Sequence, residues 1–165
     1  MSDVKTGKSG TPGRPAHRAG RDDYRWQGVE ILPYKEDARA LFQAITRQIL
    51  FADPALQSEL RYFEMEAGGF STLERHEHMH AVLIFRGQGH CLVGSEVRRV
   101  AFRDLIMVPP WTWHQFRATS DQPLGFLCMV NAERDKPQLP SAQDLAELEA
   151  DPRIAAFLRG RPMVE

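Results

Sequence analysis

The chain has 165 residues, of which 42% are hydrophobic, and this length and composition support one domain with a substantial core. A formal net charge of −1 and a pI of about 6.6 argue against a nucleic-acid partner held by bulk electrostatics. No apolar run approaches the ~18 residues that span a bilayer, and the first residues lack the apolar stretch of a signal peptide. Two cysteines are too few for a disulfide framework. We therefore expect a cytoplasmic protein with no membrane partner.

The first third of the chain changes character several times. Residues 1–22 are rich in Gly, Ser, Pro, Lys and Arg, which predicts a disordered tail. Residues 24–32 look like a first strand. Within residues 36–50 the apolar side chains have helical spacing, so an amphipathic helix competes there with a strand followed by a turn. Residues 57–66 read as a strand that ends at a pair of glycines.

The middle of the chain consists of short apolar runs at close, regular spacing, which indicates a β-sandwich or barrel. We expect Gly87-Gln-Gly89 to form a hairpin turn, because glycine readily adopts positive φ. The expected strands are 81–85, 90–93, 97–102, 105–108, 113–118 and 124–130. Residues 23–140 therefore form the predicted barrel with its N-terminal elements.

The last segment, residues 141–165, changes to a helical period. Ser141 and Asp144 resemble a capping box at a helix start. Apolar residues then recur at helical spacing, and Asp151-Pro152 interrupts the pattern. We expect one or two short helices here.

Five of the six histidines lie between His76 and His114, and three of them alternate with other residues just before an apolar strand. Side chains two apart on a strand share a face, so Glu74, His76, His78 and His80 are expected to point to one side. Imidazole and carboxylate together suit a divalent metal such as Mn, Fe, Ni, Co or Zn, and His114 is a further candidate ligand. The alternative is a polar edge strand whose histidines are solvated.

The spacing of these residues resembles the first motif of the cupin family. Gly68, Glu74, His76, His80 and Gly87 occupy its positions, although Glu74 stands where histidine is common and His80 where glutamate is common. The exchange keeps one carboxylate among these three ligands. The resemblance implies an all-β fold dominated by a cupin double-stranded β-helix, or jelly-roll, barrel.

The second cupin motif resembles residues 104–114 and implies that His114 is the fourth ligand beside Glu74, His76 and His80. In this register His78 lies in the connecting turn, where we expect it to be solvated; the alternative is that it takes the place of one of the four ligands. The family resemblance also implies a homodimer formed through sheet faces.

Residues 74–137 are similar to a narrower cupin group, the manganese-dependent 1-methylthio-xylulose 5-phosphate sulfo-lyases of methylthioadenosine salvage. This resemblance implies that manganese and the thiolate of Cys128 remove a methylthio group to give 1-deoxyxylulose 5-phosphate. The methylthio group would remain on Cys128 as a mixed disulfide, which an external thiol such as glutathione then reduces. From the residues alone, Cys128 could instead be a small buried side chain. Cys91 matches nothing in the resemblance and is interpreted as structural.

A phosphorylated ketose needs a cation for its phosphate and an apolar wall for its methylthio group. Arg75, Arg117 and Trp113 are candidates for these roles, with surface charge or barrel core as the alternative readings. Two other functions remain open from the same residues. They are a metal-dependent dioxygenase acting on a small enolic or phenolic substrate, and a cupin that binds a small molecule without catalysis.

Overall fold

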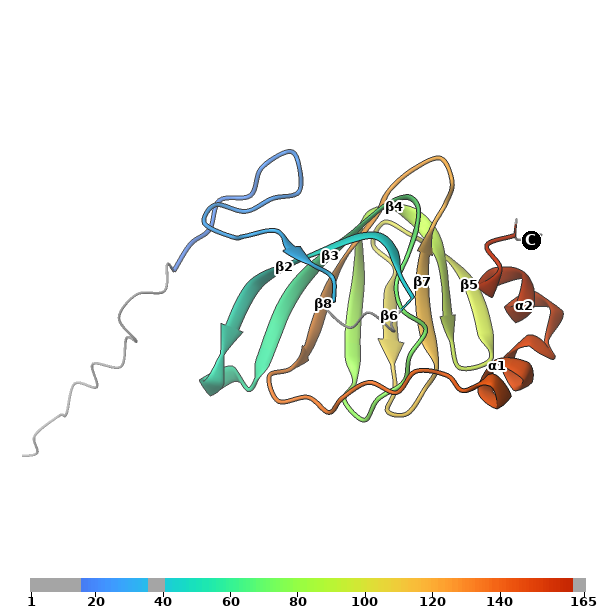
Figure 1. Ribbon diagram of the computed structural model, residues 1–165. Helices are drawn as coiled ribbons and strands as arrows, with labels where there is room; N and C mark the ends of the chain where they lie inside the picture. The colour runs from blue at the N-terminus through green and yellow to red at the C-terminus, as the bar shows by residue number, and fades with distance from the viewer. Residues whose placement is uncertain (1–15, 36–40, 162–165) are drawn as a thin grey trace, which may run out of the picture.

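The computed structural model describes residues 16–35 and 41–161, which form a closed barrel of antiparallel strands followed by two short helices (Figure 1). The all-β jelly-roll expectation is confirmed. The strands are β1 (Leu32–Pro33), β2 (Gln43–Asp53), β3 (Ser58–Phe70), β4 (His80–Val93), β5 (Glu96–Ala101), β6 (Leu105–Val108), β7 (His114–Ala118) and β8 (Leu124–Asn131), with a 3-10 turn, η1 (Pro54–Leu56), between β2 and β3.

The barrel is one eight-stranded sheet, which closes because its two longest strands, β3 and β4, change partners along their length. The first half of β4 pairs with β6 and β8, and its second half pairs with β5 and β7. β3 pairs with β2 and β8 along most of its length and meets β7 at Phe70, opposite Arg117. The inward side chains fill the interior with a core that includes Phe63, Phe116 and Phe126.

β4 runs without interruption through the glycines that the sequence predicted as a hairpin turn. Gly87 has φ of 66°, and the register against β8 shifts just before it, between Ile84 and Arg86. A Cβ at Gly87 would lie 1.8 Å from the carbonyl oxygen of Pro123. The glycine therefore allows close backbone approach at a bulge, where β4 changes its partner from β8 to β7, and it does not form a chain reversal.

One expectation for the N-terminal third is wrong and one pair of alternatives is resolved. Residues 36–50 were open to a helix or a strand, and the structure has a strand there, β2, from Gln43 onward; residues 36–40 lie outside the described part of the chain. The predicted first strand is mostly loop, with only β1 at its end. Its aromatic residues Tyr24 and Trp26 instead pack on Tyr62 and Phe85 at the outer face of the sheet.

Residues 1–15 of the expected disordered tail also lie outside the described residues. Beyond them, Gly20 forms an isolated bridge with Trp26, and Arg18 donates a hydrogen bond to the carbonyl oxygen of Gly28 at 3.0 Å.

The two C-terminal helices, α1 (Ala142–Glu149) and α2 (Pro152–Leu158), confirm the predicted change of period. Ser141 and Asp144 form the capping box of α1, and Asp151 caps α2. Ile154 and Phe157 bury α2 against the barrel beside β5 (Figure 1). Across residues 16–35 and 41–161, no helix is long and apolar enough to cross a membrane.

Candidate metal centre

The predicted ligands come from three separate parts of the chain that meet at one end of the barrel. Glu74 lies between β3 and β4 and pairs with His114 at the start of β7, where each backbone N–H donates to the carbonyl oxygen of the other at 3.2 and 3.0 Å. His76 follows on the same segment, and its carbonyl oxygen accepts from the N–H of Trp111 at 2.7 Å. His80 begins β4.

Within this cluster the side chains form two sets that could hold a metal ion. Glu74, His76 and His114 form one set, and His76, His78 and His80 form the other. In each set the ligand atoms lie within 4.8 Å of one another. His76 belongs to both sets, so the predicted ligands Glu74 and His80 lie in different sets joined through His76.

His78 is placed differently from its expected position as a solvated turn residue. Its side chain is only 8% exposed, and its ring stacks on that of His76 with centroids 3.6 Å apart and an interplanar angle of 4°. Its Nδ1 lies 2.6 Å from a carboxylate oxygen of Asp135. The motif spacing did not indicate this contact, because Asp135 follows β8 in a run of charged residues that looks like ordinary surface.

Three imidazoles of the cluster, those of His76, His80 and His114, have lowered pKa values, which favours the neutral form that binds metals. Burial, followed by the proximity of His114 and His78, lowers the pKa of His76 to about 3. Burial is also the main cause that lowers the pKa values of His80 and His114. A neutral imidazole keeps a lone pair on one nitrogen, which is what a metal requires.

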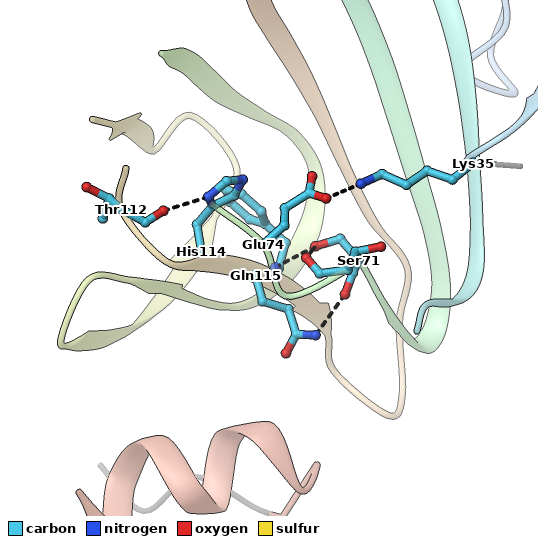
Figure 2. A network of polar contacts seen from close by, with 8 residues as sticks. Lys35, Ser71, Glu74, Thr112, His114 and Gln115 are labelled. Carbon is cyan, nitrogen blue, oxygen red and sulfur yellow. Dashed lines mark hydrogen bonds and ion pairs between the residues drawn. The ribbon is translucent and has the colours of Figure 1, made fainter. Parts of the chain in front are cut away.

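The hydrogen bonds of His76 and His114 show which nitrogen carries that lone pair. Nδ1 of His76 donates to the carbonyl oxygen of His78 at 2.7 Å, and Nδ1 of His114 donates to that of Thr112 at 3.0 Å (Figure 2). The Nε2 atoms of His76 and His80 are buried without any hydrogen-bond partner. Buried polar atoms are rarely left unpaired, so these nitrogens fit a divalent ion as their missing partner.

Lys35 adds a charge that the sequence did not indicate. Its ammonium contacts the Glu74 carboxylate, with the two side chains 22% and 7% exposed (Figure 2). Lys35 lies outside both motifs, just after β1, so no local pattern marks it. The Glu74 carboxylate is thus positioned by a cation as well as by the backbone.

Cys128 on β8 lies directly beside this cluster. Its Sγ is 3.4 Å from Nδ1 of His80, and Nη2 of Arg61 approaches it to 4.0 Å. Cys128 is 1% exposed, so burial raises the pKa of its thiol, while the Arg61 guanidinium opposes that rise. Sequence reasoning missed Arg61, although it alternates with Phe63 on β3 and so shares its inward face.

The substrate-binding candidates lie away from the cluster, towards the C-terminal segment. The guanidinium of Arg75 stacks on Trp113 at 4.4 Å from the ring centre, and its Nε donates to Gln138 at 3.2 Å. Arg117 packs against Phe70 and Phe157 beneath α2. The structure therefore brings Arg75 and Trp113 together, while Arg117 lies opposite His90 in the pairing of β4 with β7.

Comparison with known proteins places the chain among the cupins. The cupin domain family matches residues 61–130. A protein of Rhodospirillum rubrum named 1-methylthio-D-xylulose 5-phosphate methylsulfurylase is 59% identical over 140 residues, which cover 85% of this chain and 90% of that relative.

Solved structures agree with this assignment. A cupin 2 conserved barrel domain protein from Rhodopseudomonas palustris is 59% identical, with a TM-score of 0.81 over 86% of this chain and 98% of that one. A cupin 2 domain-containing protein from Halorhodospira halophila is 42% identical, with a TM-score of 0.64 over 84% of this chain and 90% of that one.

Proposed function

The chain belongs to the cupin family and is an enzyme, and we propose that it removes the methylthio group from 1-methylthio-xylulose 5-phosphate to give 1-deoxyxylulose 5-phosphate, a step of methylthioadenosine salvage. The proposal takes its substrate from the name of the Rhodospirillum rubrum relative at 59% identity. We place the reaction in the cytoplasm, where thiol co-substrates stay reduced.

One observation carries the mechanism: a cysteine stands beside the imidazoles that fit a metal. Cys128 Sγ is 3.4 Å from Nδ1 of His80, whose Nε2 has no other partner. A purely structural cysteine has no need of such a neighbour. A dioxygenase or a binding protein would have no use for the thiol either, so this juxtaposition favours the lyase.

Glu74, His76, His80 and His114 would hold the divalent ion. One carboxylate among imidazoles suits manganese, although iron, nickel, cobalt or zinc would also accept this donor set. When bound, the ion supplies Lewis-acid stabilisation of the negative charge that develops on the C2 oxygen of the ketose.

Cys128 carries the sulfur chemistry. Its thiolate attacks the methylthio sulfur and forms a mixed disulfide, while the C1–S bond breaks and leaves its electron pair on C1 as the enolate. Protonation at C1 completes 1-deoxyxylulose 5-phosphate. An external thiolate such as that of glutathione then attacks the methylthio sulfur, takes the methylthio group as a second mixed disulfide and releases the Cys128 thiolate.

The test compares Cys128→Ser with Cys91→Ser in the manganese-loaded protein. We expect Cys128→Ser to keep its metal content and lose formation of the deoxyketose phosphate, measured by mass spectrometry of the products. Cys91→Ser, which changes a buried core position away from the cluster, should keep both. A Cys128→Ser enzyme with full turnover would contradict the mechanism.

We also propose that the partner of this chain is a second copy of itself, and an apolar row on the outer sheet face supports this. Strand pairing aligns five apolar residues across five strands: Phe51, Leu60, Met129, Ala81 and Met107. Met107 is 63% exposed and Met129 is 52% exposed. Neighbouring strands lie about 4.8 Å apart, so the row extends about 19 Å from the first residue to the last, and monomers rarely expose so large an apolar patch.

The face suits self-association rather than a charged partner. The adjacent row continues the apolar pattern through Leu127, Leu83 and Leu105, the last 81% exposed. At a two-fold axis a residue meets its own copy, so charged side chains would repel and apolar ones pack. The net charge of −1 also gives two copies almost no mutual repulsion.

A further inference from the structure

We propose that His78, oriented by Asp135, is itself a ligand of the divalent ion, in addition to the four residues that the cupin motifs indicate. The inference rests on the metal site of the proposed function but not on its methylthio chemistry. It concerns a residue that the motif spacing assigns to the connecting turn.

The ring of His78 is oriented in the same way as the rings of the other histidines in the cluster, with a partner at Nδ1. His76 and His114 have their Nδ1 atoms bound to backbone carbonyl oxygens, and His80 has its Nδ1 against the sulfur of Cys128. His78 has its Nδ1 bound to the Asp135 carboxylate at 2.6 Å. In all four rings Nδ1 is thus occupied, which leaves Nε2 for the metal.

The partner of the His78 ring is a carboxylate, that of Asp135. A carboxylate that accepts from one ring nitrogen fixes the tautomer and makes the other nitrogen a stronger metal ligand. Asp135 also accepts from the backbone N–H of Glu77 at 2.8 Å and from that of His78 at 3.2 Å. The same carboxylate therefore holds both the ring and the short loop that carries it, far along the chain from its own position.

The ring of His78 lies close to the rings of His76 and His80. The ring of His78 lies parallel to that of His76 at 3.6 Å and is 5.3 Å from that of His80, centre to centre. The ligand atoms of these three residues lie within 4.8 Å of one another. Each imidazole lone pair lies in the plane of its own ring, so binding one ion through both residues requires the stacked ring of His78 to turn out of parallel with that of His76.

We propose one ion and not two, because both candidate sets need His76. His76 has a single available nitrogen, because its Nδ1 is bound to a carbonyl oxygen, so it cannot hold two ions at once. A six-coordinate ion such as manganese would take Glu74 and the four histidines, and one position would remain for the substrate oxygen.

The experiment measures manganese affinity and the number of coordinating nitrogens in the purified full-length protein. Affinity comes from competition with a metal-chelating dye, and pulsed electron paramagnetic resonance of bound Mn(II) reports the nitrogens. The variants are His78→Ala, His78→Phe, which keeps a ring stacked on His76, and Asp135→Asn. His90→Ala is the control, because it removes an imidazole on β4 that belongs to neither candidate set.

We expect both His78 variants to lose one coordinating nitrogen and more than about 100-fold in affinity, beyond the ~10–100-fold typical of losing an orienting partner. Asp135→Asn should keep all nitrogens and lose affinity within that range, and His90→Ala should match the wild type. An unchanged nitrogen count in the His78 variants would overturn the inference, even if affinity fell. Wild-type protein that binds no divalent ion would instead overturn the metal site of the proposed function.

Discussion

The two buried cysteines differ in their surroundings, and the roles we propose for them rest on this difference. Cys128 has the Arg61 guanidinium and the His80 ring beside its sulfur. Cys91 lies in the apolar core, paired with Phe116 on β7 and Arg98 on β5, and burial outweighs the effect of the Arg98 charge on its thiol. A reactive thiolate needs nearby positive charge or a metal, whereas a thiol among apolar side chains stays protonated and inert.

This contrast predicts how Cys91 affects stability at high pH. Burial raises the pKa of the Cys91 thiol from its ordinary 9.0 to about 11, with Asp104 adding to the rise and Arg98 opposing it. The unfolded chain therefore loses this proton at lower pH than the folded protein. The associated stability is complete below pH 9 and is lost as the pH rises through 11, by about 2–3 kcal/mol.

The measurement is chemical denaturation of wild type and Cys91→Ala at several pH values between 8 and 11. The difference between the two isolates Cys91 from the lysines and tyrosines that ionise in the same range. We expect the free energy of unfolding to fall less steeply with pH in Cys91→Ala. Equal slopes for the two proteins would show that the buried thiol does not contribute.

At the scale of elements, the bulge in β4 gives the sharpest prediction. Gly87 and Gly68 both have positive φ, 66° and 75°, but a Cβ at Gly87 would meet the Pro123 carbonyl oxygen at 1.8 Å, while one at Gly68 would meet nothing within 4 Å. Gly68→Ala should cost about 1 kcal/mol for its backbone strain, and Gly87→Ala more than about 3 kcal/mol. Denaturant unfolding of both variants measures this difference, and equal losses would contradict the close approach.

The elements that the sequence predicted well are those bounded by clear turn residues. β5 follows the turn at Gly94, β6 ends before a proline pair, and α1 begins at its capping box, and all three lie close to where they were expected. The sequence did not distinguish β2 from a helix, because two register shifts break the alternation of inward and outward side chains along the strand. Ile45 and Leu50 both face the core although they are five apart, so no two-residue period is visible in the sequence.

The candidate site shows the same division between local pattern and tertiary contact. The resemblance to the cupin motifs implied Glu74, His76, His80 and His114 as ligands, and the structure places them in two sets that share His76. Asp135 and Arg61 could not be placed this way, since each reaches its partner across the fold, at His78 and at Cys128. Their roles depend on strand pairing that the sequence does not specify locally.

For the whole molecule, the apolar outer face predicts a dimer in solution. Sedimentation or light scattering should give twice the chain mass for the wild type. Met107→Lys should shift the protein towards monomer, because a buried ammonium would face its own copy, and should retain bound metal. Leu145→Lys, at an exposed apolar position on α1, is the control and should remain dimeric. A monomeric wild type would contradict the proposed partner.

The central claim is that Cys128 takes the methylthio group, and intact-protein mass spectrometry tests it most directly. Manganese-loaded protein is incubated with 1-methylthio-xylulose 5-phosphate in the absence of any external thiol. We predict one added methylthio group in place of one hydrogen, located on Cys128 by peptide mapping, absent from Cys91 and released by glutathione. Formation of the deoxyketose phosphate without this adduct, or an adduct on Cys91, would contradict the account.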